Sequence, residues 1–450
     1  QQHPHPLTIP EGRHILLTYV RTLFRILFVL KAYGTREGVG QLTNGKSYEK
    51  SHPWLDFSPD LRNASHRLWM LLGAAQSKCQ HLAGVPLLPD VAQELHRVFL
   101  AKGALATTAI EGNTLEERDV LALLEGTLDL PRSQEYLGRE VANIINTCNR
   151  IGDGVLLPQP AHLNTQEIMG YNAQILQDIP QKDGTTPGEF RTRSVVVGGG
   201  IYRGAPAEDC PYLVDRLCLW LQKLTDPETP ILGKEFPVAS GILAAVLAHL
   251  YLVWIHPFGD GNGRTARILE FRLLLEAGAP TPAAHLLSNH YNKTRSEYYR
   301  HLHEATAPGG VLRFMEYALQ GLVDELDEQI RFVRWQEVKV LWGHIVQRAF
   351  SGKTTPASQR RHALVLALSD AGGPVGIKAI RKLSAEIALA YYHKTDKTLS
   401  RDINALTEGG LVRRTGGKVE ANVEQTLNLF PRRRGDAKEF LLPKGITAPD

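Results

Sequence analysis

The feature that most constrains this chain is the segment His256–Arg267, which directly follows a long apolar run. Ile242–Ile255 is apolar except for one histidine, so it predicts a buried helix. Pro257 disfavours helical backbone at the residue before it, and the helix should therefore stop with the His256 imidazole at its end. Phe258 is expected to anchor the following loop in the core.

The loop carries the parts of an anion site. Gly261 and Gly263 allow the backbone to turn its N–H groups inward, and a new helix is predicted to begin near Arg264, where the helix dipole also favours negative charge. Arg264 and Arg267 are three positions apart, share a helix face and can clamp phosphates. Asp260 supplies an oxygen ligand suited to Mg²⁺. The segment thus combines a base, a metal ligand, an anion nest and two arginines, which are the groups needed to transfer a phosphorus group. The alternative, a glycine-rich loop that only caps a helix, would leave these positions without a role.

The same segment resembles the Fic family signature HPFx(D/E)GNGRxxR at every defining position. The resemblance implies a protein adenylyltransferase in which His256 takes the proton of a Ser, Thr or Tyr hydroxyl on a target protein. That oxygen would attack the α-phosphate of ATP. Asp260 would hold Mg²⁺, Asn262 would contact the phosphate near the reacting centre, and Arg267 would reach the γ-phosphate. Catalytic roles fall to His256, Asn262 and Arg264, and the remaining ATP-binding positions of the segment are Gly261, Gly263, Thr265 and Ala266.

A short β signal lies upstream of the signature. Val195–Val197 is followed by three glycines and then by Ile201 and Tyr202, which predicts a hairpin. It resembles the flap of the family, where the backbone of the target protein pairs as an added strand. The residues expected to border the nucleotide are Val197, Gly198, Gly199 and Gly200.

Ser296–Tyr299 resembles the family segment that closes over the adenine, which makes Tyr298 and Tyr299 expected ATP contacts. Thr306 stands where related members often have an asparagine. Taken alone, the two tyrosines would more often be core aromatics.

Thr107–Asn113 resembles the inhibitory motif of the family, (S/T)xxxE(G/N), with Thr107 and Glu111 at the required spacing. A Glu111 carboxylate paired with Arg267 would occupy the guanidinium that the γ-phosphate needs and would repel the triphosphate. The alternative is an ordinary helix end capped by Gly112, with Glu111 in solvent.

Composition is that of a soluble globular protein. The chain has 450 residues, 43% hydrophobic and 22% charged, with a net charge of +4, so it can bury more than one core and is not by charge alone a nucleic-acid binder. Its four cysteines include no CxxC pair, which favours reduced, buried thiols in a cytoplasmic protein. Ile15–Leu30 is interrupted by two arginines, which argues against a membrane span and a signal peptide.

Helical periodicity dominates, so the expected class is mainly α. The resemblance implies a Fic helical bundle with a short hairpin flap, and the C-terminal part is expected to add a small winged helix-turn-helix domain. Ser351–Ser358 reads as a linker. The expected parts are an amphipathic or poorly ordered extension (1–46), a helical region with the inhibitory helix (47–150), the catalytic domain (151–348), the winged helix (358–425) and a flexible tail (426–450).

The winged helix raises the question of DNA. Lys397, Arg401 and Asn404 could face a major groove from its third helix. The wing residues expected to touch phosphates are Arg413, Arg414 and Lys418. Packing or homodimerisation is the alternative, since a fold does not fix a function.

Three other functions stay open. The first is a Fic-related phosphotransferase that binds ATP inverted, against which Gly263 argues because it keeps the nest open for a β-phosphate. The second is a DNA-binding regulator with a vestigial Fic domain, which the intact His256, Asp260 and Arg267 disfavour. The third is removal of AMP, with Glu111 positioning a water.

Overall fold

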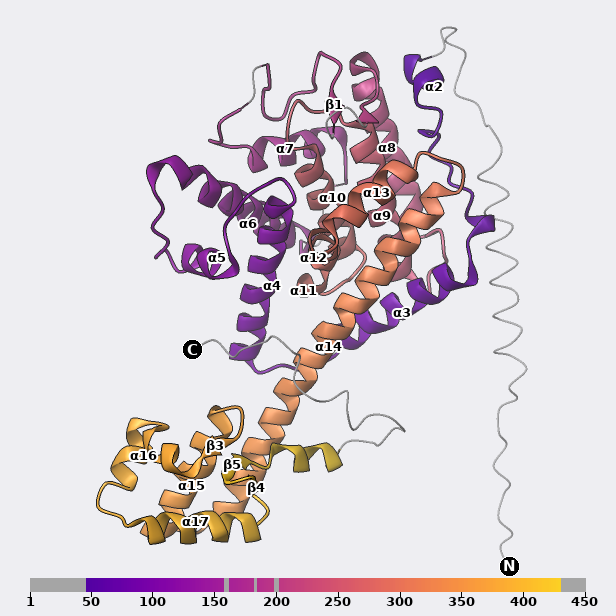
Figure 1. The fold of residues 1–450 in the computed structure, drawn as a ribbon. Coiled ribbons are helices and arrows are strands. Elements are labelled where there is room, and N and C mark those ends of the chain that lie inside the picture. Colours follow the sequence, from indigo (N-terminus) through magenta and orange to yellow (C-terminus); the bar gives the residue numbers. More distant parts are fainter. Residues whose placement is uncertain (1–45, 158–161, 182–183, 198–201, 430–450) are drawn as a thin grey trace, which may run out of the picture. The chain divides into compact units, whose positions relative to one another are not determined.

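The computed structural model describes residues 46–157, 162–181, 184–197 and 202–429, and helices make up most of this part of the chain (Figure 1). The expectation of a mainly α protein is confirmed. Two compact units meet between Asp327 and Glu328, inside helix α14 (Gly310–Phe350). The division falls before the expected linker because the last turns of α14 contribute Trp342 and Val346 to the core of the second unit.

The first unit is a helical assembly around two central helices. Its α-helices are α2 (Ser47–Ser51), α3 (His66–Ala83), α4 (Pro89–Ala109), α5 (Glu117–Leu124), α6 (Glu135–Val155), α7 (Thr165–Ile175), α8 (Cys210–Leu224), α9 (Pro237–Ile255), α10 (Asn262–Glu276), α11 (Thr281–Ala284), α12 (Leu286–Lys293), α13 (Arg295–Glu304) and the first part of α14. Helices α9 and α10 pack on each other, α3 and α8 lie against α9, and α6 and α7 lie against α10. The segment between α9 and α10 is therefore held between packed helices.

Helix α9 is the most deeply buried element of the unit. Leu250, Tyr251 and Trp254 are all nearly inaccessible to solvent. Burying one large apolar side chain stabilises a fold by about 1.5–3 kcal/mol, so α9 gives the site a fixed base. Among the described residues it is the one helix long and apolar enough to cross a membrane, but 94% of that apolar stretch is buried within the protein, as in a core helix.

The expected hairpin is present as β1 (Val196–Val197) and β2 (Tyr202–Arg203). The strands are antiparallel, with Val197 opposite Tyr202. The Tyr202 hydroxyl donates to the Trp254 carbonyl at 2.8 Å, which ties the hairpin to α9. The predicted nucleotide contacts Gly198, Gly199 and Gly200 lie outside the described residues.

The second unit has its own core and a small sheet. Besides the end of α14 it contains α15 (Pro356–Asp370), β3 (Val375–Gly376), a 3-10 helix (Ile377–Lys382), α16 (Ala385–Ala390), α17 (Asp396–Glu408), β4 (Val412–Thr415), β5 (Lys418–Ala421) and a second 3-10 helix (Val423–Leu429). The antiparallel strand order is β3-β5-β4. The expected wing hairpin coincides with β4 and β5, while the winged-helix assignment itself stays a prediction.

The described structure runs a few residues past the expected start of the C-terminal tail. Thr426, placed in the flexible tail by the sequence, is fully buried inside the second 3-10 helix, so ordered structure continues to Leu429. Residues 1–45 and 430–450 lie outside the described residues. All four cysteines are buried and unpaired, as expected.

Candidate active site

The expected catalytic histidine closes helix α9 in an unusual backbone conformation. His256 has φ of 51°, in the left-handed region, which costs a residue with a Cβ about 1–2 kcal/mol. Arg191 holds this conformation: its Nε donates to the His256 carbonyl at 2.7 Å, and its backbone N–H donates to the Pro257 carbonyl at 3.0 Å. The Arg191 guanidinium also donates to the carbonyls of Arg193 and Ala205. Sequence reasoning missed Arg191, which lies 65 positions before His256 and outside every motif considered.

The His256 ring is oriented by one hydrogen bond. Its Nδ1 lies 3.2 Å from the Val253 carbonyl, which can only accept, so Nδ1 carries the proton in the neutral ring and Nε2 keeps its lone pair. Burial lowers the pKa of His256 to about 4, and the bond to Val253 only partly offsets this effect. The imidazole is therefore neutral near pH 7 and able to accept a proton.

The loop between the two helices is braced from within. The Asn262 side chain accepts from the Phe258 N–H and donates to the Phe258 carbonyl, both at 2.9 Å. Phe258 is fully buried and stacks on Phe190, with ring centroids 5.6 Å apart. Asn262 thus folds the loop. The phosphate contact expected of it remains a prediction that would use the second hydrogen of its amide.

A second bracing amide was not predicted. Asn172 on α7 donates to the Asp260 carbonyl at 3.0 Å and to the Thr265 hydroxyl at 3.2 Å, and it accepts from the Gly188 N–H at 2.9 Å. Asn172 is 1% exposed. It therefore fixes the loop from α7 without belonging to the signature.

At both Gly261 and Gly263 a side chain would collide with neighbouring groups. Gly261 precedes α10 with φ of 75°, and a Cβ there would lie 3.0 Å from the Asn172 amide nitrogen. A Cβ on Gly263 would lie 2.4 Å from Glu111 Oε1 and 3.2 Å from Arg267 Nη1. Helix α10 begins at Asn262, two residues before the predicted start. The backbone N–H groups of its first turn, which have no partner within the helix, therefore lie at Gly263 and its neighbours.

Thr265 and Ala266 are both fully buried in that turn. The Thr265 hydroxyl donates to the Gly261 carbonyl at 2.9 Å. Their side chains face the protein, so any contribution of these two residues to ATP binding would come from the backbone.

The predicted pair between Glu111 and Arg267 is present. Arg267 Nη2 donates to Glu111 Oε1 at 2.7 Å, and the two side chains are 1% and 32% exposed respectively. Burial opposes ionisation of Glu111, but the charges of Arg267 and Arg264 outweigh it and hold the pKa of the carboxyl below its usual range. The other predicted inhibitory residue, Thr107, takes part through its carbonyl, which accepts from Arg267 Nη2 at 2.9 Å.

Several arginine nitrogens at this place lack partners. Nε and Nη1 of Arg267 and Nε of Arg264 are buried and make no hydrogen bond to the described residues. A buried N–H without an acceptor is uncommon in a folded protein and calls for an explanation. Donors of positive charge beside a helix N-terminus fit an anionic ligand such as a phosphate.

Arg264 has a partner that the sequence did not suggest. Its Nη1 donates to Oε1 of Glu140, on α6, at 2.6 Å, and its Nη2 lies 3.3 Å from Asp260 Oδ2. The Arg264 side chain is 5% exposed, so this arginine is shared by two carboxylates inside the protein. Only the contact with Asp260, at i and i+4, could have been foreseen from helical spacing.

The two tyrosines expected over the adenine differ. Tyr298 is 2% exposed and its hydroxyl lies 2.9 Å from His249 Nε2, so its side chain belongs to the core, and the adenine contact expected of it stays a prediction. Tyr299 is 46% exposed, and its hydroxyl donates to the Ile110 carbonyl at 3.3 Å. Tyr299 can still meet a ligand, and it touches the turn that carries Glu111.

A Mg²⁺ ion would fit Asp260 as a shared ligand. The Asp260 side chain is 27% exposed, and no cluster of three or more His, Cys, Asp or Glu side chains occurs among the described residues. Mg²⁺ commonly uses one or two protein carboxylates together with phosphate oxygens, and one carboxylate beside an anion site matches that pattern.

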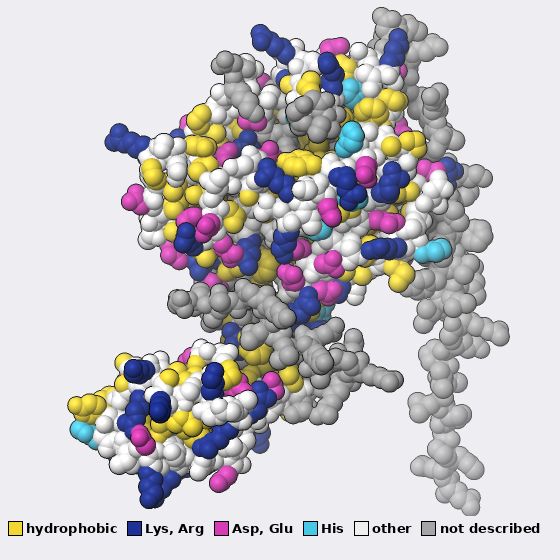
Figure 2. All heavy atoms as spheres, viewed as in Figure 1, with side chains coloured by type: hydrophobic (Ala, Val, Ile, Leu, Met, Phe, Trp, Pro, Cys, Tyr) yellow, Lys and Arg dark blue, Asp and Glu magenta, His cyan; other side chains and the backbone are white. Residues whose placement is uncertain are grey.

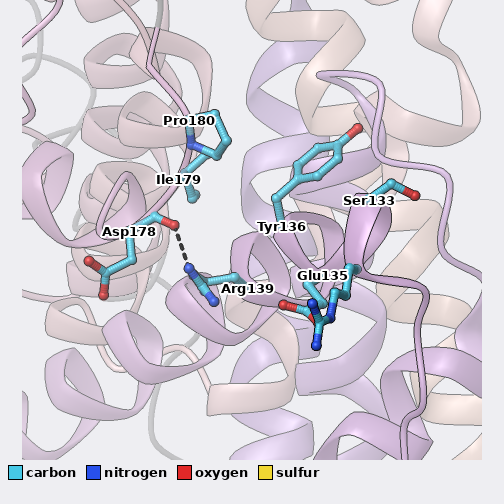
Figure 3. A pocket seen from close by; sticks show the side chains of 8 residues that line it. Ser133, Glu135, Tyr136, Arg139, Asp178, Ile179 and Pro180 are labelled. Carbon is cyan, nitrogen blue, oxygen red and sulfur yellow. Dashed lines mark hydrogen bonds between the residues drawn. The ribbon is translucent and has the colours of Figure 1, made fainter.

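A separate pocket lies where α6 begins and where the chain leaves α7 (Figure 3). Arg139 crosses it and donates to the Asp178 carbonyl at 2.8 Å, with Tyr136 on the same helix. None of the residues lining this pocket belongs to the signature, so it is distinct from the site around His256.

Comparison with known proteins finds a family that part of this unit resembles. Residues 162–274 match the Fic/DOC family model. The chain is 29% identical over 211 residues to protein adenylyltransferase fic-1 of Caenorhabditis elegans, covering 47% of this chain and 37% of that protein. It is 30% identical over 202 residues to protein adenylyltransferase Fic of Drosophila melanogaster, covering 44% and 35%. The matched region therefore spans little more than a third of these relatives.

Solved structures give similar matches. Fic-1 of C. elegans (residues 134–508 of that protein) is 20% identical, covers 71% of this chain and 86% of that one, and has a TM-score of 0.49. A Fic family protein from Desulfovibrio desulfuricans is 20% identical, covers 79% and 96%, and has a TM-score of 0.47.

Proposed function

We propose that the first unit transfers AMP from ATP to a Ser, Thr or Tyr hydroxyl of a target protein. The observation that carries this proposal is the pair of buried arginines, Arg264 and Arg267, with unpartnered N–H groups at the start of α10. Across the same loop lies the neutral imidazole of His256. The relatives named protein adenylyltransferases support the same reaction.

In this reaction the target oxygen bonds to the α-phosphorus of ATP while its proton moves to Nε2 of His256. The bond from the α-phosphorus to the oxygen bridging toward the β-phosphate breaks, and pyrophosphate leaves with the electron pair. The product is a phosphodiester of AMP on the target, and His256 later releases its proton to solvent. The Val253 carbonyl keeps the required tautomer throughout.

The phosphates would lie over the first turn of α10. Arg264 and Arg267 would donate to phosphate oxygens through nitrogens that now lack acceptors, and the backbone around Gly263 would approach closely because it carries no side chain. Mg²⁺, held by Asp260 and the phosphates, would supply positive charge that offsets the charge of the leaving pyrophosphate.

The same geometry supports autoinhibition. Glu111 lies against Gly263 and occupies Arg267 Nη2, so it takes the place proposed for the terminal phosphates. Its ionised carboxylate also repels a triphosphate. We propose that ATP binds productively only after the turn carrying Glu111 moves.

The hairpin is the proposed dock for the target. Val196 is 52% exposed, an unusual degree for a valine in a sheet. An extended target segment could add to this two-stranded ribbon by backbone hydrogen bonds and present its hydroxyl toward His256.

Removal of AMP is a second candidate at this site. The Glu111 carboxylate is ionised and about a third exposed, and it interacts electrostatically with His256. Such a carboxylate could hold a water for attack on AMP already attached to the target.

DNA binding is a candidate for the second unit. Lys397 and Arg401 are exposed on α17, and Lys and Arg side chains are spread over the face of this unit seen in Figure 2. Arg414 Nη2 donates to Asn404 Oδ1 at 2.6 Å and so ties β4 to α17. Arg413 is paired with Glu420 and Glu424, which makes it a poor phosphate ligand and weakens the role expected of it.

The proposed reaction is tested by giving the full chain α-labelled or γ-labelled ATP, with the Glu111→Gly variant used to relieve inhibition. Adenylyl transfer places the α-label on protein, and His256→Ala abolishes this labelling. Protein-bound γ-label would instead indicate a phosphotransferase and contradict the proposal.

A further inference from the structure

One partly buried carboxylate, that of Glu140, contacts both halves of the site. Glu140 Oε1 accepts from Arg264 at 2.6 Å, and its Oε2 accepts from the Asn113 amide at 2.9 Å. The Glu140 side chain is 13% exposed. It thus contacts both the phosphate-binding helix α10 and the turn that carries Glu111.

Asn113 is the residue that closes this turn. Its Oδ1 accepts from the Leu115 N–H at 3.1 Å, and its Nδ2 also donates to the Leu137 carbonyl at 2.9 Å. Its own N–H bonds the Thr108 carbonyl at 3.1 Å. Asn113 is 7% exposed, and its amide attaches the turn after α4 to α6 through Leu137 and Glu140.

Arg264 is divided between Glu140 and Asp260, with the shorter contact going to Glu140. If Glu140 lost its charge, the guanidinium would be drawn toward Asp260, because planar guanidinium and carboxylate groups favour two parallel hydrogen bonds. Asp260 is the residue proposed to hold Mg²⁺, and a closer arginine would compete with the metal for its oxygens.

We propose that Glu140 is a positioning residue with two effects: it keeps Arg264 from pairing fully with Asp260, and through Asn113 it holds the turn that places Glu111 on Arg267. This inference rests on the proposed adenylyl transfer. It predicts opposite outcomes for two variants. Loosening the turn should activate the protein, whereas neutralising Glu140 should weaken binding of Mg²⁺ with ATP.

The chain offers matched controls. Asn143, also on α6, donates through its amide to the carbonyls of Ile175 and Gln177. Glu167 pairs with Arg272, a buried arginine of α10 outside the site, and its side chain is 27% exposed. Asn143→Ala and Glu167→Gln therefore remove comparable contacts that do not reach the nucleotide.

The first measurement is self-modification by the full-length chain from α-labelled ATP. Asn113→Ala should raise the rate several-fold above wild type, toward that of Glu111→Gly, and Asn143→Ala should not. A rate for Asn113→Ala equal to that of Asn143→Ala, with Glu111→Gly activated, would overturn the turn-holding role.

The second measurement is calorimetric binding of ATP to Glu111→Gly proteins, with Mg²⁺ or with a chelator. Adding Glu140→Gln should raise the Kd for ATP about tenfold when Mg²⁺ is present, as expected for loss of one charge-assisted contact. With the chelator, the same substitution should raise the Kd for ATP clearly less. Adding Glu167→Gln should change neither. Equal shifts in both conditions, or none, would overturn the effect on Asp260. If Glu111→Gly itself neither binds ATP nor transfers AMP, the proposed function fails instead.

Discussion

The sharpest prediction concerns Glu111→Gly. In the wild type, Oε1 of this carboxylate accepts from Nη2 of Arg267 at 2.7 Å and lies 2.4 Å from where a Cβ of Gly263 would be. Removing the Glu111 carboxylate should free the buried guanidinium of Arg267 to bind the phosphates of ATP. It should also remove a negative charge that repels those phosphates. A charge-assisted hydrogen bond contributes about 1.5–3 kcal/mol, or roughly ten- to hundredfold in productive ATP occupancy. Because the carboxylate is 32% exposed, solvent screening favours the lower end, about tenfold.

The assay compares self-modification from α-labelled ATP in the wild type, Glu111→Gly, Arg267→Ala and the double variant. Glu111→Gly should be about tenfold more active than wild type. Arg267→Ala should cancel the gain, because the freed arginine is what the first substitution exploits. Glu111→Gln keeps the shape of the side chain without its charge, so its rate of self-modification should lie between those of the wild type and Glu111→Gly. An unactivated Glu111→Gly, or a gain that survives without Arg267, would refute the autoinhibitory pair.

Three further predictions concern other parts of the chain. His256→Ala should lower transfer by about 10²–10⁴-fold with an unchanged melting temperature, because the ring supplies a base rather than packing; a well-folded variant with near-full activity would exclude that role. Burial lowers the pKa of His256 to about 4, so kcat/KM of Glu111→Gly should fall only as the pH drops toward 4, and a limb near 6.5 in the pH profile would contradict the buried, neutral base. The full chain should bind duplex DNA weakly, and replacing Lys397 and Arg401 by alanine should each lower the slope of log K against log salt by about 1; an unchanged slope would exclude α17 as the contact.

The signature could be interpreted from sequence because its geometry is local. The apolar run predicts α9, Pro257 ends it, and the glycines predict the turn into α10. The pair between Glu111 and Arg267 was also predicted, although the residues lie 156 positions apart, because each belongs to a recognisable motif.

What the sequence did not reveal are partners that have no motif of their own. Arg191, Asn172 and Glu140 reach the site from three different segments, and only the packing of the fold brings them there. The sequence also did not separate Tyr298 from Tyr299, since the family resemblance and the core-aromatic alternative applied to both. Tyr298 lies against His249 in the core, whereas Tyr299 is 46% exposed. Adjacent helical positions point in different directions, and the helix register that decides between them depends on tertiary packing.

The conformation of His256 depends both on its neighbours in the sequence and on a residue from a distant segment. The residue before a proline must leave the helix, but nothing local requires it to enter the left-handed region, where a Cβ is disfavoured. Arg191, which lies outside the signature, stabilises that conformation because its Nε donates to the His256 carbonyl. Its backbone N–H also donates to the carbonyl of Pro257, the next residue. In this conformation Nδ1 lies 3.2 Å from the Val253 carbonyl, and Nε2 is the nitrogen proposed to face the substrate. Arg191 therefore helps to orient the proposed base from a distant segment, which is why the signature alone predicts the base but not its orientation.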